Sequence, residues 1–322
     1  MSARSRLLVA LAVSSAVVVG GVTMERRLGA APPIPSEEEP GVSGARYCPH
    51  GGGSGWRAWV IVANPTEGPA DIVVTSRSGA GPPQTTASTV APGTHLYLEV
   101  QAPEMASASV VEFFGSAVAA AMVTARPDGE GGVAAEPCMD RPATRWFVPE
   151  ASTLRGQQAS VVIHNPFASE AVIDVGLLTG RGPIRHGRLK GLVLDPGQVK
   201  AVSIGRFALG QQGVATAVTA DLGRVVVAGI NGSTAGVRSV VGTPAPADRW
   251  ILPGTGEPSN GRLVVVAALG QAAFRADALG PEGQAPLVDL ESAGPGSAAV
   301  FDLGGQVGGV LVEGEGDSPL LA

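Results

Sequence analysis

The stretch Arg145-Trp146-Phe147-Val148-Pro149, followed by Ser160-Val161-Val162-Ile163-His164-Asn165-Pro166, decides the fold because a related stretch stands on either side of it. The earlier copy runs from Arg46-Tyr47-Cys48-Pro49 to Asn64-Pro65, and the later copy runs from Arg249-Trp250-Ile251-Leu252-Pro253 to Ala268-Leu269. Each copy then reaches a Pro-Gly pair and another alternating run, at Pro92-Gly93, Pro196-Gly197 and Pro295-Gly296. Three copies in register predict three similar modules in a row.

The spacing of the copies predicts the size and class of each module. Arg46 and Arg145 are 99 residues apart, which is the size of an immunoglobulin-type sandwich. The second copy contains short apolar or alternating runs between turn signals, as in such a sandwich. Its last two runs, 214–220 and 224–230, are predicted to form a hairpin around Asp221-Leu222-Gly223. We therefore expect an all-β chain with three tandem immunoglobulin-like β-sandwich repeats at residues 46–140, 141–245 and 246–322, the last one shorter.

The composition supports strands and argues against some partners. The chain of 322 residues has 46 Gly and 26 Pro, the two residues that disfavour helices most. Its net charge of −6 argues against a nucleic-acid partner, which requires a basic face. Only four Trp, two Tyr and seven Phe are present, which counts against flat stacking platforms for sugars or bases.

The N-terminus carries an export signal. Arg4 and Arg6 precede the uncharged run Leu7–Met24, which is long enough to span a bilayer as a helix. Residues 1–24 are therefore predicted to be a transmembrane signal-anchor that holds the chain on the cytoplasmic membrane, and residues 25–45 a Pro- and Glu-rich disordered linker. The alternative is a cleaved signal. Retention makes this a single-pass membrane protein with an extracytoplasmic C-terminal region, and cleavage makes it secreted.

The two cysteines, Cys48 and Cys138, flank the first predicted module. In a chain that leaves the cytoplasm, a disulfide between them is the first hypothesis. A metal site is not expected, because the histidines are scattered and no CxxC is present.

A basic segment in the second copy is the candidate contact for an anionic partner. The cluster lies within a stretch of ten residues and consists of Arg181, Arg185, Arg188 and Lys190, although the chain as a whole is acidic. The corresponding turns of the other copies lack such a cluster. An anionic partner would be a lipid headgroup, an acidic envelope polymer or an acidic protein face. The alternative is an ordinary solvated turn.

No catalytic motif emerges from the sequence. The string Gly51-Gly52-Gly53-Ser54-Gly55 has Trp56 where a nucleophile elbow needs glycine, and no P-loop or dinucleotide-binding glycine motif is present. His164 is expected to be a packed or strand-edge residue, and the acidic residues Asp174, Asp195 and Asp221 are expected in solvated or turn-capping roles. Neither a catalytic residue nor a cofactor is predicted.

The order of Arg-Tyr-Cys-Pro, the Asn-Pro strand ends, Glu136-Pro137-Cys138 and Arg145-Trp146 resembles an actinobacterial family of exported, membrane-anchored proteins of unknown function. The loop Glu150-Ala151-Ser152-Thr153 also resembles repeats of bacterial cell-surface proteins. Genes of this family often lie beside a gene for a membrane glycosyltransferase, so the resemblance implies an envelope setting. It implies no established activity.

Two functions follow as expectations. The first is a non-catalytic cell-envelope protein that presents its three β modules outside the cytoplasmic membrane, in a structural role or for interaction with an unknown envelope protein. The second is a glycan-binding accessory module that serves an envelope glycosyltransferase. An enzyme is not expected, since the search for catalytic motifs found none.

Overall fold

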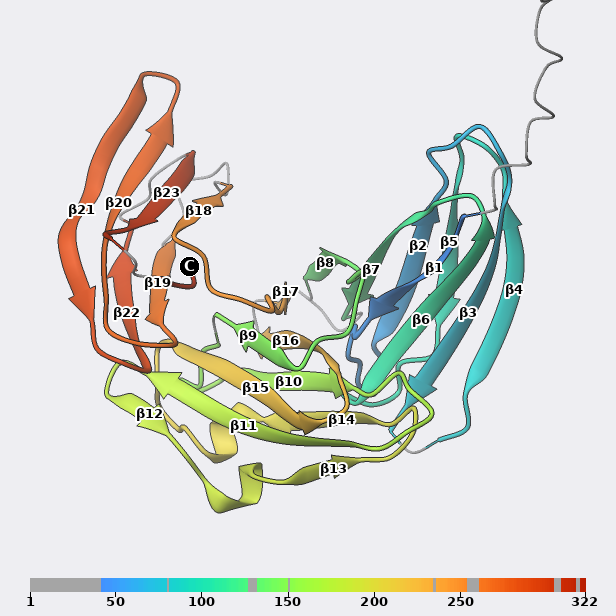
Figure 1. Cartoon of the computed structure of the whole chain (residues 1–322), viewed down its shortest axis with the longest axis horizontal. Coiled ribbons are helices and arrows are strands. Elements are labelled where there is room, and N and C mark those ends of the chain that lie inside the picture. Colours follow the sequence, from blue (N-terminus) through green and yellow to red (C-terminus); the bar gives the residue numbers. More distant parts are fainter. Residues whose placement is uncertain are drawn as a thin grey trace, which may run out of the picture. The chain divides into compact units, whose positions relative to one another are not determined.

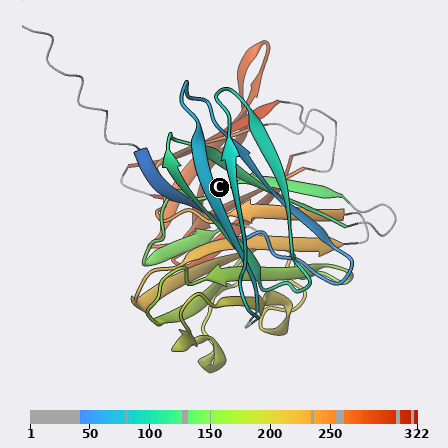
Figure 2. The same cartoon turned by 90° about the vertical axis from the view of Figure 1, so that its right-hand side faces the viewer.

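The computed structural model describes residues 42–79, 81–126, 132–149, 151–233, 236–253, 261–303, 308–316 and 319–322. Residues 42–322 form one compact unit. Figures 1 and 2 show that the described chain consists of strands joined by turns and loops. Its helical segments are two 3-10 turns of three residues each, η1 (Gly187–Leu189) and η2 (Ile204–Arg206).

The predicted transmembrane helix at residues 1–24 and nearly all of the predicted linker lie outside the described residues. Within the described part of the chain, neither 3-10 turn has the length or the apolar surface needed to cross a membrane.

Two four-stranded antiparallel sheets contain the first strands of the chain. Their inner faces share one core, in which Val60 and Val62 pack with Ile72, Val111 and Phe113. This packing follows from alternation, because every second side chain of a strand points to the same face. One sheet has the order β1 (Val42–Cys48), β6 (Ser107–Gly115), β3 (Ala70–Ser78) and β4 (Gln84–Val90), and the other has the order β5 (His95–Val100), β2 (Arg57–Ala63), β7 (Ala119–Ala125) and β8 (Val133–Pro137).

The following strands divide between a four-stranded sheet and a seven-stranded sheet. The four-stranded sheet has the order β14 (Val199–Ser203), β10 (Gln158–His164), β16 (Val226–Ser233) and β17 (Gly236–Val241). The seven-stranded sheet contains β19 (Arg262–Ala267), β22 (Ser297–Asp302), β11 (Ala171–Thr179), β15 (Val214–Leu222) and β9 (Arg145–Val148) in this order, with β12 (Gly182–Ile184) and β13 (Leu192–Leu194) also paired to β11.

The predicted hairpin of runs 214–220 and 224–230 is wrong. These residues form β15 and β16, which lie in different sheets: β15 pairs with β11 and β9, whereas β16 pairs with β10 and β17. Gly223 between them has a φ of 76°, a left-handed conformation that favours glycine, so the chain turns there from one sheet into the other.

The last sheet is formed near the C-terminus. It has the order β18 (Arg249–Leu252), β23 (Gly309–Gly314), β20 (Ala272–Gly280) and β21 (Gly283–Ala293). Phe274 and Val312 are fully buried in a core of their own beside it.

The predicted fold class is wrong in its specific form, although the all-β content is correct. The sheets do not separate into three independent immunoglobulin-like sandwiches, because β19 and β22 of the third copy extend the sheet formed by β11, β15 and β9 of the second. The join is a parallel pairing of Thr179 with Ser297. The domain boundaries at 141 and 246 stay a prediction.

The chain between the copies is also tied to neighbouring strands. Ala143 and Val225 exchange two backbone hydrogen bonds of 3.0 Å, and Thr243 and Phe147 exchange two of 2.7 and 2.8 Å. These bridges hold β9 between the two sheets, and β9 carries the first residues of the candidate site.

Candidate functional site

A pocket lies on the outer face of the seven-stranded sheet. Strand β11 separates two faces by alternation: Ile173, Val175 and Leu177 are buried in the core, while Asp174 and Gly176 lie on the opposite face. The β-branched and leucine side chains are buried on the inner face of the strand, and the residues between them point to the outer face.

Strand pairing places residues from three strands in rows on this outer face. Asp174 lies opposite Thr219 of β15, which in turn lies opposite Arg145 of β9. The next row is Gly176, Ala217 and Phe147. The floor therefore changes from polar to small and apolar over one step of two residues.

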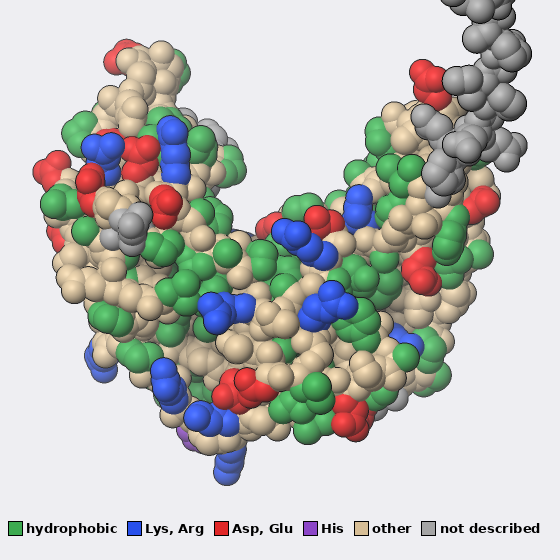
Figure 3. Space-filling view, viewed as in Figure 1, with side chains coloured by type: hydrophobic (Ala, Val, Ile, Leu, Met, Phe, Trp, Pro, Cys, Tyr) green, Lys and Arg blue, Asp and Glu red, His purple; other side chains and the backbone are tan. Residues whose placement is uncertain are grey.

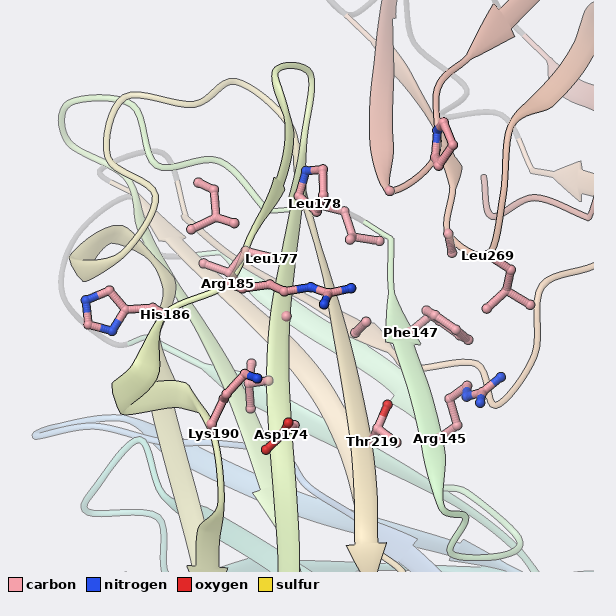
Figure 4. A pocket seen from close by; sticks show the side chains of 18 of the residues that line it. Arg145, Phe147, Asp174, Leu177, Leu178, Arg185, His186, Lys190, Thr219 and Leu269 are labelled. Atoms are coloured by element: carbon pink, nitrogen blue, oxygen red, sulfur yellow. The ribbon is translucent and has the colours of Figure 1, made fainter.

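The walls of the pocket come from turns on either side. The segment between β12 and β13 contributes Arg185 and Lys190, and the third copy contributes Leu269 and the Pro295-Gly296 turn. Together with the floor they enclose a volume of about 560 Å³. Figure 4 shows Arg185 extending over the floor, with Lys190 and Asp174 at one end and Arg145 on the far side. A pocket of this size can hold a small ligand or a short segment of a polymer.

One end of the floor is closed by apolar packing. Phe147 and Leu178 are buried together with Ala215, Val264 and Val266, which belong to β15 and β19. This contact fixes the apolar end of the pocket, because a buried cluster resists the movement of any one member.

The charges around the pocket are predominantly positive. Arg145, Arg185 and Lys190 are exposed, while Asp174 and Asp221 supply the negative charges. None of these five residues forms a salt bridge with another described residue. The pocket is therefore a cationic site in an acidic protein.

Asp174 has a structural role in this arrangement. Its Oδ1 accepts a hydrogen bond of 2.7 Å from the backbone N–H of Gly191, which holds the segment that carries Lys190 against the sheet. The φ of Gly191 is 60°, so a side chain at this position would strain the turn.

The structure separates the four predicted basic residues into two pairs. Arg185 and Lys190 line the pocket, whereas Arg181 and Arg188 do not. His186, between them, lies in an edge-on contact with Phe207 at 5.0 Å between ring centres, and its Nδ1 accepts a hydrogen bond from the backbone of Arg188. In Figure 3, Lys and Arg side chains are spread over the part of the face formed by the strands from β9 to β15.

The sequence did not identify the other pocket residues as members of a site. Arg145 was part of the opening of the second copy, and Asp174 and Asp221 were expected in turn or solvated roles. The signal that unites them is the pairing of β11, β15 and β9. This pairing joins Thr219 to Arg145, 74 positions away, and to Asp174, 45 positions away, so no local pattern reveals it.

The predicted disulfide is confirmed. Cys48 at the end of β1 is bonded to Cys138 just after β8, with an S–S distance of 2.05 Å and 4.6 Å between the two Cα atoms. The bond joins strands of the first two sheets. A disulfide persists in an oxidising compartment, which agrees with a chain that leaves the cytoplasm.

Two buried histidines lie in the first and second copies. His50 is fully buried, its Nδ1 lies 2.7 Å from the carbonyl of Gly51, and its Nε2 lies 3.0 Å from Ser109 Oγ. His164 is 1% exposed, and neither of its ring nitrogens has a hydrogen-bond partner among the described residues. Burial lowers the pKa of His50 to about 4 and the pKa of His164 to about 3. Both rings are therefore neutral at physiological pH.

Among the described residues, no group of three or more His, Cys, Asp or Glu side chains is placed to hold a metal ion.

Comparison with known proteins identifies a family without an assigned role. The profile of the family described as "Family of unknown function (DUF5719)" matches residues 99–313. No curated protein matches the chain. Among solved structures, a similarity is found to the crystal structure of Streptomyces avermitilis alpha-L-rhamnosidase complexed with L-rhamnose, at 9% identity and a TM-score of 0.19. It covers 90% of this chain and 45% of that one, and a TM-score this low carries no argument.

Proposed function

This chain belongs to the DUF5719 family, whose function is unknown, and we propose that it acts outside the cytoplasm as a non-catalytic cell-envelope protein that binds an anionic partner. The pocket on the outer face of the seven-stranded sheet is the binding site in this proposal. The Cys48–Cys138 disulfide and the resemblance to exported actinobacterial proteins support the extracytoplasmic setting.

The observation that carries the proposal is the convergence of Arg145, Arg185 and Lys190 on one pocket. They come from β9 and from the segment after β12, and none forms a salt bridge with a described residue. Several cations around a concave surface raise the local concentration of an anionic ligand and strengthen its binding. Guanidinium groups also bind carboxylates and phosphates through two parallel hydrogen bonds.

A glycan is the second candidate, and a specific observation favours an acidic one. Thr219, Asp174 and Asp221 lie in the same pocket as the cations. Hydroxyl and carboxylate groups form hydrogen bonds with sugar hydroxyls, while the cations would hold an acidic group on the sugar. An acidic polysaccharide of the envelope therefore fits the mixed lining better than a neutral one.

The test compares binding of the full chain to polygalacturonate, polyglutamate and neutral dextran. The variant Arg185→Ser/Lys190→Ser removes two pocket cations, and Arg181→Ser/Arg188→Ser is the matched control from the same segment. We expect the pocket variant to bind about tenfold or more weakly, since each cation contributes about 1 kcal/mol near an anionic surface. The control should bind nearly as tightly as the parent chain.

The binding should also weaken as salt rises, because exposed charges are screened within about 8 Å at physiological ionic strength. Equal affinities of the two double variants would contradict the proposal, as would a parent chain that binds none of the acidic polymers. Binding of polygalacturonate but not polyglutamate would select the glycan over an acidic protein face.

A further inference from the structure

A second and separate pocket lies at the end of the sheet that contains β10, β16 and β17. It encloses about 320 Å³, and its lining is mostly polar. Arg238 comes from β17, Arg262 from the start of β19, and Ser152 and Gln157 from the loop before β10. Ser152 belongs to the Glu-x-Ser-Thr loop, a motif that the pocket on the seven-stranded sheet does not use.

The pairing of β16 with β17 forms one wall of this pocket. Asn231 of β16 lies directly opposite Arg238 of β17, so the two side chains share a face of the sheet. The backbone of Gly132 closes another side, because a Cβ atom added to Gly236 would lie 3.0 Å from the backbone nitrogen of Gly132. The φ of Gly236 is 142°, which also favours glycine at this position.

The two arginines are close enough to influence each other. Partial burial lowers the pKa of Arg238, the positive charge of Arg262 lowers it further, and the negative charge of Glu136 opposes both effects. Like charges brought together repel, and an anion between them relieves the repulsion. Because Arg238 and Arg262 line the same pocket, its charge favours a ligand of negative charge.

The hydroxyl group of Ser152 adds a hydrogen-bond donor to the pocket. The residue is 8% exposed, and its Oγ has no hydrogen-bond partner among the described residues. A buried hydroxyl without a partner costs free energy, and rotation about its Cα–Cβ bond can direct it to a bound oxygen. Gln157 adds a side-chain amide to the lining of the same pocket.

We propose that this pocket is a binding site for a tetrahedral oxyanion group, a phosphate or a phosphate ester, held between Arg238 and Arg262 with Ser152 as a hydroxyl donor. Guanidinium groups match the oxygens of such a group in geometry and charge. The volume leaves room for part of a molecule that carries the phosphate, such as a sugar. The site is independent of the pocket on the seven-stranded sheet, because the two share no residue.

The experiment measures phosphate binding by calorimetry with the full chain. To remove the contribution of the other pocket, the titrations are performed in the Arg185→Ser/Lys190→Ser background. The probes are inorganic phosphate, glucose 1-phosphate and glucose, with chloride at equal ionic strength as the blank. We expect phosphate to bind with one site per chain and glucose not to bind.

Three variants locate the site. Arg262→Gln should weaken phosphate binding about tenfold or more, as expected for the loss of one charge-assisted hydrogen bond. Ser152→Ala should weaken it several-fold with unchanged thermal stability, since its hydroxyl has no hydrogen-bond partner among the described residues of the unliganded fold. The matched control is Arg206→Gln, an exposed arginine of η2 that lines neither pocket.

The outcomes are decisive in both directions. Phosphate binding that fails to exceed the chloride blank, or that survives both Arg262→Gln and Ser152→Ala, overturns the proposal. Tighter binding of glucose 1-phosphate than of inorganic phosphate identifies a sugar phosphate as the ligand, and the reverse order identifies the free anion. Failure here leaves the polymer-binding result of the first pocket unaffected, so the two proposals are tested separately.

Discussion

Asn64 and Asn165 make equivalent hydrogen bonds at the ends of β2 and β10. The side-chain amide of Asn64 donates to the carbonyls of Gly68 and Val90 at 2.8 and 3.0 Å. That of Asn165 donates to the carbonyls of Ser169 and Leu194 at 2.7 and 3.2 Å. Each buried asparagine thus connects the end of its own strand to two other segments through side-chain hydrogen bonds. The Asn-Pro pair therefore both ends the strand and holds neighbouring segments against it.

The first prediction concerns the hydrogen bonds of Asn165. Asn165→Ala leaves the buried carbonyl of Leu194 without its side-chain donor, and also removes the oxygen that accepts from the N–H of Phe167. We expect the free energy of unfolding to fall by about 1–3 kcal/mol, which is the cost of buried groups left unpaired. Urea denaturation measures it. Gln84→Ala, at an exposed position at the start of β4, serves as the control and should change stability little.

The second prediction concerns the disulfide. Cys48→Ser/Cys138→Ser opens a covalent loop whose ends are 90 residues apart. In the chain-entropy model this loss destabilises the protein by about 4–5 kcal/mol. Denaturation of the double variant beside the oxidised parent chain measures the difference. A stability equal to that of the oxidised parent would show that the bond constrains the unfolded chain far less than its span implies.

The third prediction concerns pH. Burial lowers the pKa of His164, assisted by the positive charges of Arg77 and His50, and burial lowers the pKa of His50 against a hydrogen bond to Gly51. In the unfolded chain both histidines bind a proton near pH 6.5. Below that pH the unfolded state therefore binds more protons, and the free energy of unfolding falls as the pH drops from about 6.5 toward 4 and below.

The measurement is urea denaturation at pH 7 and pH 5. Each histidine should contribute a loss of about 2 kcal/mol between the two. His164→Leu removes one titrating group without removing a hydrogen bond to any described residue, so this variant should lose about 2 kcal/mol less than the parent on acidification. Identical losses in parent and variant would mean that His164 is protonated in the folded state.

The fourth prediction concerns a substitution that fills the pocket on the seven-stranded sheet. Gly176 lies on its floor, its φ is not in the left-handed region, and a Cβ atom there would meet only the carbonyl oxygen of Ala217 within 4 Å, at 3.9 Å. Gly176→Leu should therefore fold normally and occupy the space meant for the ligand. We expect it to abolish binding of acidic polymer while thermal stability is retained.

The control for this variant is Gly205→Leu, in η2 outside both pockets, where a Cβ atom would meet no described atom within 4 Å. It should bind like the parent chain. Undiminished binding by Gly176→Leu would exclude the floor of this pocket as the binding surface.

The sequence by itself determined the local structure of this protein. Alternating apolar residues marked β2, β10 and β11, and Asn-Pro marked the ends of β2 and β10. The three Pro-Gly pairs marked turns in which Gly93, Gly197 and Gly296 all have φ between 66° and 69°. Cys48 and Cys138 were paired correctly because they are the only two cysteines in a chain that was expected to be exported. These features depend on neighbouring residues or on elimination, so they are visible in the chain itself.

Only the tertiary structure decided which strands pair. Alternation reports that one face of a strand is buried, but it does not report the partner. The sequence therefore placed β15 and β16 in one hairpin, and it kept β19 and β22 apart from β11. The candidate site depends on these same pairings, since Arg145, Thr219 and Asp174 become neighbours only when β9, β15 and β11 lie side by side. Contacts over such separations are set by the packing of the whole sheet, and that packing has no signature within any single strand.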